Sequence, residues 1–230
     1  MTGVSAAPVL LWLRQDLRLS DNPAMAAALE RRSPVIPVFI WAPEEEGAWQ
    51  PGAASRWWLH HSLASLSTEL EKRGSRLIIR RGPTAAALSR LVADSGASAV
   101  LWNRRYEPAA AARDRDVKSK LRESGLTVES FNGSLLVEPW TIRNSSEQPF
   151  RVFTPFWRAC LNQPLAPVCE DAPQRLPSPD QWPHSLDLAG LSLEPAVDWA
   201  GGFREVWQPG ESGARSQLQR FLREALVSIL

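Results

Sequence analysis

VLLWL at residues 9–13 and VIPVFIW at residues 35–41 are the two continuously apolar runs that decide the fold of this chain. Three shorter runs follow, at residues 76–79, 97–102 and 126–131. Continuous apolarity, rather than alternation of apolar and polar residues, is typical of strands that are covered on both faces, as in a parallel sheet. Because helical patterns separate the runs, we predict an α/β fold with a Rossmann-like, doubly wound sheet of five parallel strands.

The helical patterns between these runs have recognisable ends. The first covers residues 22–31 and follows Asp21, a candidate N-cap, with Pro23 in its first turn. The other three each stop at a glycine, where helices commonly end, and they cover residues 54–73, 84–95 and 108–124.

After residue 131 the pattern changes, and we predict four parts. Residues 1–131 form the core of the α/β domain, and residues 132–162 complete it with a short helix at 153–161. Residues 163–210 form a long linker that wraps the folded surface, because it carries many apolar side chains: Leu176, Trp182, Leu186, Leu188, Leu191 and Trp199. Residues 211–230 are expected to be the first helix of a missing domain, because its apolar stripe has little to pack on: Leu218, Phe221, Leu222, Ala225 and Leu226.

Composition excludes several classes of protein. The 230 residues are 44% apolar and 22% charged, and a formal net charge of +1 is not that of a polycation that grips nucleic acid along its whole surface. The start of the chain has no signal or membrane-spanning pattern, so we expect a cytoplasmic protein with no membrane contact. Cys160 and Cys169 have no CxxC spacing, and the three histidines form no metal set, so no metal site is predicted.

Ligands of an open doubly wound sheet bind beyond the carboxyl ends of its strands, near the point where the strand order reverses. This rule points to the loops at residues 14–16, 41–56 and 103–107. Arg56 lies in the first turn of its helix and shares a face with Leu59, so we expect it to point toward the sheet. The alternative is an ion pair between Arg56 and one of Glu44, Glu45 and Glu46.

Other residues of these loops also have two interpretations. Glu107 precedes Pro108 and has the place of an N-cap residue, a purely structural role. Asp16 is either a ligand-binding group or part of an ion-pair network with the neighbouring Arg14 and Arg18. Three tryptophans close strands and are core-filling by default, yet they would also suit a flat conjugated ligand: Trp12, Trp41 and Trp102.

Common catalytic and nucleotide-binding motifs are absent from the sequence. There is no GxGxxG after the first strand, no GxxxxGK[ST] and no evident Ser-His-Asp arrangement. A self-sufficient enzyme is therefore not expected.

Several segments resemble motifs of class I DNA photolyases and of the related cryptochromes, in the same order and at the same spacing. They are WLRQDLRLSDN at 12–22, PGAASRWWL at 51–59, WNRRYEP at 102–108, Arg113-Asp114 with Val117, FRVFTPFW at 150–157 and WQPGE at 207–211. The resemblance covers essentially the whole chain and identifies it with the amino-terminal α/β antenna domain of that family.

The resemblance implies a light-dependent flavoprotein of two domains. An antenna chromophore in the α/β domain passes light energy to reduced FAD in a helical domain, which splits a cyclobutane pyrimidine dimer flipped out of DNA. Damaged DNA would be bound through the helical domain, which is missing here, so FAD binding and repair by this fragment alone are not expected. Ile229 stands where the family tends to have a tyrosine that reaches the FAD phosphates.

The resemblance also bears on the antenna chromophore. Family members that bind methenyl-folate carry an Asn-Glu pair where this sequence has Ala109 and Ala110, so a deazaflavin or a flavin is favoured. The implied contacts come from the loops named above: Arg14, Asp16, Arg56, Asn103 and Glu107 as polar groups, with Phe39, Trp41 and Trp102 against the ring. In the alternative, Trp57 or Trp58 fills the pocket.

Three other functions remain open at this stage. A cryptochrome-type photoreceptor would share every motif and differ only in the missing half. A plain nucleotide-binding module would have the same topology. A chromophore-free interaction fragment would dock through the helix at 211–230.

Overall fold

The computed structural model describes residues 6–164 and 171–225. It contains a five-stranded parallel sheet in the order β3-β2-β1-β4-β5, which confirms the predicted fold. The strands are β1 (Val9–Leu13), β2 (Val35–Trp41), β3 (Ile78–Arg81), β4 (Ala99–Asn103) and β5 (Thr127–Phe131). Every residue of β1, β2 and β4 is buried, as their continuous apolarity indicates. Among the described residues, no helix has both the length and the apolarity needed to cross a membrane.

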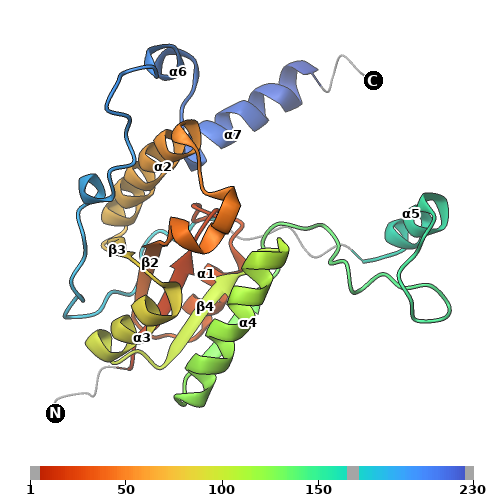
Figure 1. Cartoon of the computed structure of the whole chain (residues 1–230), viewed down its shortest axis with the longest axis horizontal. Coiled ribbons are helices and arrows are strands. Elements are labelled where there is room, and N and C mark those ends of the chain that lie inside the picture. Colours follow the sequence, from red (N-terminus) through yellow and green to blue (C-terminus); the bar gives the residue numbers. More distant parts are fainter. Residues whose placement is uncertain (1–5, 165–170, 226–230) are drawn as a thin grey trace.

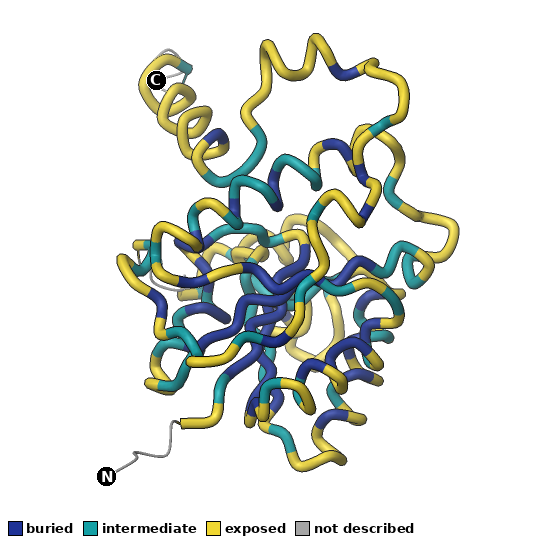
Figure 2. The backbone as a smooth tube through the Cα atoms, turned by 90° about the vertical axis from the view of Figure 1, so that its left-hand side faces the viewer, coloured by how far each residue is buried: buried dark blue, intermediate teal, exposed yellow. Residues whose placement is uncertain are grey.

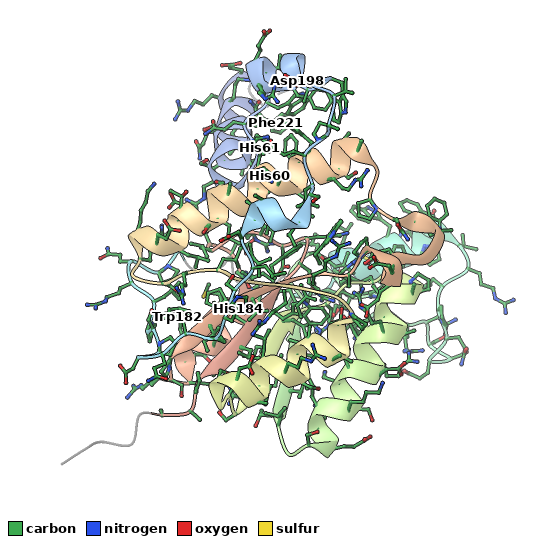
Figure 3. The ribbon with its side chains drawn as sticks, turned by 60° about the vertical axis from the view of Figure 1, so that its left-hand side comes forward. His60, His61, Trp182, His184, Asp198 and Phe221 are labelled. Carbon is green, nitrogen blue, oxygen red and sulfur yellow. The ribbon has the colours of Figure 1, made fainter. Side chains whose placement is uncertain are left out.

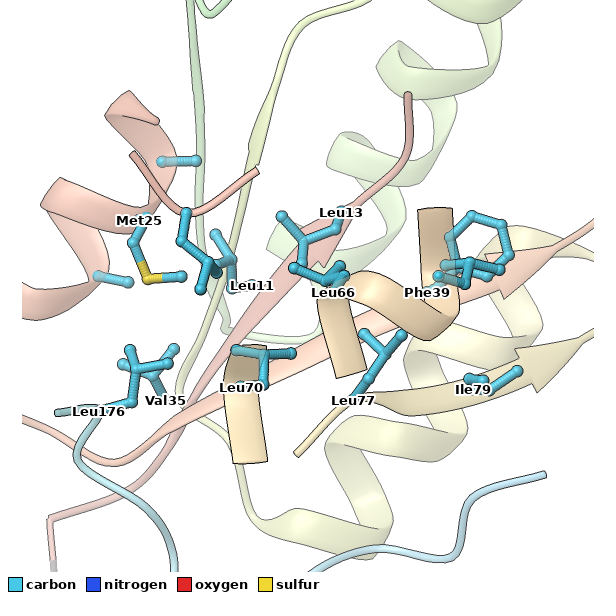
Figure 4. Close-up of a cluster of buried hydrophobic side chains, with 14 of the residues drawn as sticks. Leu11, Leu13, Met25, Val35, Phe39, Leu66, Leu70, Leu77, Ile79 and Leu176 are labelled. Carbon is cyan, nitrogen blue, oxygen red and sulfur yellow. The ribbon is translucent and has the colours of Figure 1, made fainter. Parts of the chain in front are cut away.

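Helices cover both faces of the sheet (Figure 1). On one face, α1 (Pro23–Glu30) and α2 (Ala53–Lys72) pack on Leu11 and Leu13 of β1 (Figure 4). On the other face, α3 (Thr84–Ser95) and α4 (Pro108–Glu123) pack on Leu10 and Trp12, because alternate residues of a strand face opposite ways. The strand order reverses between β1 and β4, so the crevice expected of this topology lies beyond their carboxyl ends.

Some element boundaries differ from the sequence-based prediction. Asn22, not Asp21, is the N-cap of α1: its Oδ1 accepts a hydrogen bond of 3.1 Å from the N–H of Met25. Asp21 instead has a φ of +48° in the preceding turn. Strand β3 begins two residues later than predicted and continues through Arg80 and Arg81, because its pairing with β2, rather than its apolarity, sets its length.

Parts of the segment from residue 171 to residue 200 lie against the end of α2 and the outer edge of β3. Its backbone joins that of the domain, since the N–H of Leu186 donates to the carbonyl of Ile79 at 3.0 Å. Leu176 and Leu191 are buried in the core cluster, and η2 (Leu188–Leu191) lies within this segment. Leu186 and Trp199 are more exposed, and Trp199 packs on Phe203 with the ring centres 5.7 Å apart. The strand edge that would otherwise be open is covered.

Two segments extend away from this core. Helix α5 (Phe153–Leu161) has no buried residue and stands apart from the sheet (Figure 1). A short helix missed by the prediction, α6 (Gly201–Val206), precedes α7 (Glu211–Arg220) and the π-helical turn η3 (Phe221–Ala225). This end of the chain is mostly exposed (Figure 2), including Leu218, Phe221 and Leu222 of the predicted stripe. Cys169, Leu226 and Ile229 lie outside the described residues.

The start of α7 is fixed to the domain by one carboxylate. Glu211 accepts a hydrogen bond of 2.7 Å from the backbone N–H of Leu19 and a second from the hydroxyl of Ser20. Both residues lie in the loop between β1 and α1. The direction in which α7 leaves the domain is therefore tied to the same loop that follows the central strand.

His60 and His61 on α2 (Figure 3) face Glu194, and their pairing gives a prediction on stability. Burial, together with the neighbouring His60 and Arg204, lowers the pKa of His61 despite the attraction of Glu194. The unfolded chain therefore binds this proton at a higher pH, and stability is lost as the pH falls from about 6.5 through the folded-state pKa.

We expect the His61→Gln variant to lose less stability than the parent chain when the pH falls from about 7.5 to about 5. Urea unfolding at several pH values measures this. His184→Gln is the matched control, because His184 is exposed and lies against Arg80 of β3 rather than against Glu194. The attribution to His61 would be contradicted if His61→Gln lost as much stability as the parent chain over this pH range. It would also be contradicted if His184→Gln changed the pH dependence of stability by the same amount.

Candidate functional site

A pocket of about 640 Å³ opens where the carboxyl ends of β1 and β2 meet the loop that follows β4. One side is formed by η1 (Pro43–Trp49), and the other by the start of α4. Its apolar lining includes Trp12, Phe39, Ile40, Trp41, Trp49, Leu59, Ala109 and Ala110, and its polar lining Arg14, Gln15, Glu46, Thr84, Arg105, Glu107 and Arg113. Aromatic walls with a few charged groups are typical of sites for flat organic ligands.

Arg14, the first residue after β1, is buried at one side of this pocket. Its Nη1 lies 2.6 Å from Oδ2 of Asp114, and its guanidinium carbon lies 4.5 Å from the centre of the Trp12 ring. Its Nη2 donates to the carbonyl of Asn103. Burial lowers the pKa of Arg14, against the opposing effect of Asp114. Since Asp114 belongs to α4, the ion pair joins the end of the central strand to the helix that bounds the pocket.

Glu46 of η1 joins two arginines across the pocket wall. Its Oε1 lies 2.7 Å from Nη1 of Arg105 and 3.2 Å from Nη1 of Arg113. Burial by itself would raise the pKa of Glu46, but the hydrogen bonds from both arginines outweigh burial and lower it. The carboxylate is therefore ionised at neutral pH, and the loop that carries it is tied to α4.

Three buried N–H groups of residues that line the pocket have no hydrogen-bond acceptor among the described residues: Nε1 of Trp12, Nε of Arg14 and Nε of Arg113. An unsatisfied buried donor costs about 1–3 kcal/mol. These groups therefore lower the stability of the folded domain.

The structure brings only half of the eight predicted site residues into this pocket: Arg14, Phe39, Trp41 and Glu107. Asp16 and Asn103 line an adjoining pocket of about 570 Å³, which Glu107 also borders. Trp102 lines no described pocket, because it is buried behind Trp12 with the ring centres 5.3 Å apart.

Arg56 is exposed and lines a third, smaller pocket rather than the main one. We predicted that Arg56 points toward the sheet on the face of Leu59, but only Leu59 lines the main pocket. The alternative ion pair with Glu44, Glu45 or Glu46 is not formed within the described residues, since Glu45 binds Thr84 and Glu46 binds Arg105.

The side-chain amide of Asn103 is hydrogen-bonded to other residues of the domain. Its Nδ2 donates to Asp16 at 2.6 Å and to Asn22 at 2.8 Å, while its Oδ1 accepts from the N–H of Ala24 at 3.1 Å. The other oxygen of Asp16 accepts from the backbone N–H of Arg14 at 2.9 Å. In the described part of the chain Asp16 forms no ion pair with Arg14 or Arg18, so the predicted ion-pair network is wrong. The two residues hold the loop after β1 against the end of β4.

Glu107 has the N-cap position of α4, but its carboxylate does not cap the helix. It lies 3.1 Å from Nη2 of Arg105 instead. Burial would raise the pKa of Glu107, and the hydrogen bond from Arg105 reverses the shift and lowers it. The side chain therefore contributes a fixed negative charge at the border of the two pockets.

The alternative in which a tryptophan of α2 fills the pocket is wrong. Trp57 is buried against His61 and Phe203, with ring centres 4.4 Å and 5.5 Å away. Trp58 packs on Trp207 at 5.8 Å. Neither lines the main pocket.

The sequence reasoning missed Glu46, Arg105 and Arg113 as pocket residues. Arg105 and Arg113 belong to the segments that carried the family resemblance, and Glu46 to the acidic run that was considered only for Arg56. The two arginines could therefore have been found because they belong to the family motifs. Their common ion-pair partner, Glu46, depends on the tertiary structure and could not have been found in this way.

Comparison with known proteins points to one family. The sequence model described as DNA photolyase matches residues 9–179. The chain is 48% identical over 227 residues to a deoxyribodipyrimidine photo-lyase of Agrobacterium fabrum, covering 97% of this chain and 46% of the relative. It is 40% identical to cryptochrome-2 of Arabidopsis thaliana, covering 95% and 36%.

Solved structures give the same picture. A bacterial class III photolyase from Agrobacterium tumefaciens superposes with a TM-score of 0.89 and 45% identity, over 98% of this chain and 47% of that one. An archaeal photolyase from Sulfolobus tokodaii, described with two FAD molecules and an implied novel light-harvesting cofactor, superposes with a TM-score of 0.65 and 25% identity, over 86% and 44%. The chain thus spans less than half the length of each of these relatives.

Proposed function

Because the chain belongs to the DNA photolyase family, we propose that its α/β domain holds an antenna chromophore in the pocket between η1 and α4. The observation that carries the proposal is a pocket at the carboxyl ends of β1 and β2 that combines aromatic walls with the side chains of Arg14, Arg105 and Arg113. A flavin or deazaflavin fits both features, since its ring is flat and its edge carries carbonyl oxygens and ring nitrogens. When bound, it would supply the absorption of blue or near-ultraviolet light.

The residues of the chain position and shield such a ring. Phe39, Trp41 and Trp12 give apolar walls that exclude water, and Arg14 is held in place by Asp114. The Glu46–Arg113 pair keeps η1 against α4, so the pocket has a defined width before the ligand arrives. Preorganisation of this kind lowers the entropic cost of binding.

A flavin-type ring is favoured over methenyl-folate by two observations. Ala109 and Ala110 line the pocket and offer only methyl groups where the folate-binding pattern has Asn and Glu. The Sulfolobus relative is described with two FAD molecules and an implied novel light-harvesting cofactor, which supports a flavin as antenna in this family.

We extend the proposal to the longer protein that the relatives represent. Residues 1–131 and 132–162 form the antenna domain, residues 163–210 the linker, and residues 211–230 the start of a helical FAD domain. That domain would bind damaged DNA and use light and FAD to split cyclobutane pyrimidine dimers. The name of the Agrobacterium relative, deoxyribodipyrimidine photo-lyase, supports a light-dependent lyase that acts on pyrimidine dimers. We expect this chain alone to lack repair activity.

A blue-light photoreceptor is the second candidate, and the 40% identity to a plant cryptochrome favours it specifically. The pocket described above would have the same antenna role in either protein. Dimer repair by a chain extended with the helical half distinguishes the two.

The test is titration of the purified chain with a deazaflavin, FMN and methenyl-tetrahydrofolate, followed by absorption and fluorescence. We expect a flavin or deazaflavin to bind, and Trp49→Ala to weaken binding by about fivefold, because an aromatic contact contributes about 1 kcal/mol. Trp49 is 88% exposed, so its loss does not disturb the core.

Trp199→Ala is the control, since Trp199 is also exposed and lines no part of the pocket. If none of the three chromophores binds the parent chain, the antenna proposal fails. Equal losses in the two variants would place the ligand elsewhere on the domain.

A further inference from the structure

A pocket of about 270 Å³ adjoins the main one. Trp41, Pro43 and Pro51 line both, so the two cavities meet at the end of β2. Leu191 and Ser192 of the linker close the far side of the smaller pocket. A group attached to a ring in the main pocket can therefore reach the smaller one by passing over these shared residues.

Two arginines line the smaller pocket, and the fold explains how they meet. Arg81 is the last residue of β3 and lies opposite Trp41 in the ladder with β2. Arg56 lies in the first turn of α2, past the end of the sheet. Residues distant in sequence thus bring two guanidinium groups to one small cavity.

These two arginines differ from those of the main pocket in lacking ion-pair partners. Arg14, Arg105 and Arg113 are all paired with carboxylates. In the described part of the chain neither Arg56 nor Arg81 has such a partner, and Glu44, the one acid that lines the smaller pocket, pairs with neither. Two positive charges against one negative leave this cavity with a formal charge of +1.

We propose that the smaller pocket binds an anionic group, a phosphate or a carboxylate, at the end of the side chain of the chromophore whose ring occupies the main pocket. This inference rests on the proposed antenna function and narrows its ligand to chromophores with a charged tail. Two guanidinium groups provide several N–H donors in the planar arrangement that suits phosphate and carboxylate oxygens. Neutral chromophores would use only the main pocket.

The experiment compares pairs of ligands that share a ring and differ in charge. FMN and riboflavin differ by one phosphate; methenyl-tetrahydrofolate and its analogue with a methylamide in place of the glutamate differ by two carboxylates. Each ligand is titrated into the parent chain, into the Arg56→Gln/Arg81→Gln variant, and into Arg90→Gln. Arg90 is exposed on α3 and lines neither pocket, so it controls for the loss of a surface charge.

For at least one pair we expect the parent chain to bind the charged ligand about 10- to 100-fold more tightly. The double variant should bind both members of that pair equally, with the affinity for the neutral one unchanged, and Arg90→Gln should behave as the parent. Because both arginines are exposed, their replacement leaves the core intact.

Two results overturn the inference while the antenna proposal survives: equal binding of charged and neutral ligands to the parent chain, or a preference that persists in the double variant. If no ligand of either pair binds the parent chain, the antenna proposal fails and this inference fails with it.

Discussion

The Asp114→Ala variant is expected to lose about 3–5 kcal/mol of unfolding free energy, because it leaves the buried guanidinium of Arg14 without its counter-charge. Arg14 is 7% exposed and Asp114 is 8% exposed, so water cannot replace the lost carboxylate. The separation of 2.6 Å between Nη1 and Oδ2 is that of a charge-assisted hydrogen bond. Nε of Arg14 already has no acceptor, so the cost of desolvation is not met elsewhere.

Chemical denaturation measures this loss, and two further variants identify its cause. Asp116→Ala removes an exposed carboxylate from the same helix and should change stability by less than about 0.5 kcal/mol. Arg14→Met/Asp114→Leu removes both charges and should recover most of the loss, since a buried pair replaced by apolar groups is often neutral. A cost below about 1 kcal/mol for Asp114→Ala, or a double variant less stable than it, would show that the pair is not an effective buried ion pair.

The strands were predictable because a strand that is buried on both faces consists almost entirely of apolar residues. VLLWL at residues 9–13 is apolar throughout and is buried throughout, so the pattern alone places β1 at the centre of the sheet. Strand β3 shows the limit of this record. Its last residues, Arg80 and Arg81, are strand by pairing with β2, and no apolar pattern indicates them.

The candidate site was predictable only where it follows from topology. The rule on carboxyl ends led to Arg14, Phe39 and Trp41, which line the main pocket because each lies in or directly after a central strand. The wall formed by Glu46 and Arg105 could not be derived, since the two residues are 59 positions apart and the conformation of η1 decides that they meet. The hydrogen bonds of Asn103 could not be derived either, because they depend on how the loop after β1 packs against the end of β4.

A large side chain in the first turn of α4 would fill the main pocket. Ala109 lines the cavity, is exposed, and carries only a methyl group toward it. An indole at this position would occupy the space proposed for the chromophore without disturbing the buried core. We therefore expect Ala109→Trp to weaken chromophore binding by on the order of 100-fold or more, the equivalent of about 2.7 kcal/mol.

Ala112→Trp is the matched variant, because Ala112 is exposed on the same helix and does not line the pocket. Both substitutions add the same side chain to α4, and both should leave the melting temperature within a few degrees of the parent value. Fluorescence titration with the chromophore that binds the parent chain most tightly then separates the two. Binding lost in Ala109→Trp and kept in Ala112→Trp locates the ligand between η1 and α4, among the aromatic and arginine side chains that line the pocket. Undiminished binding in Ala109→Trp would mean that the chromophore does not enter this pocket.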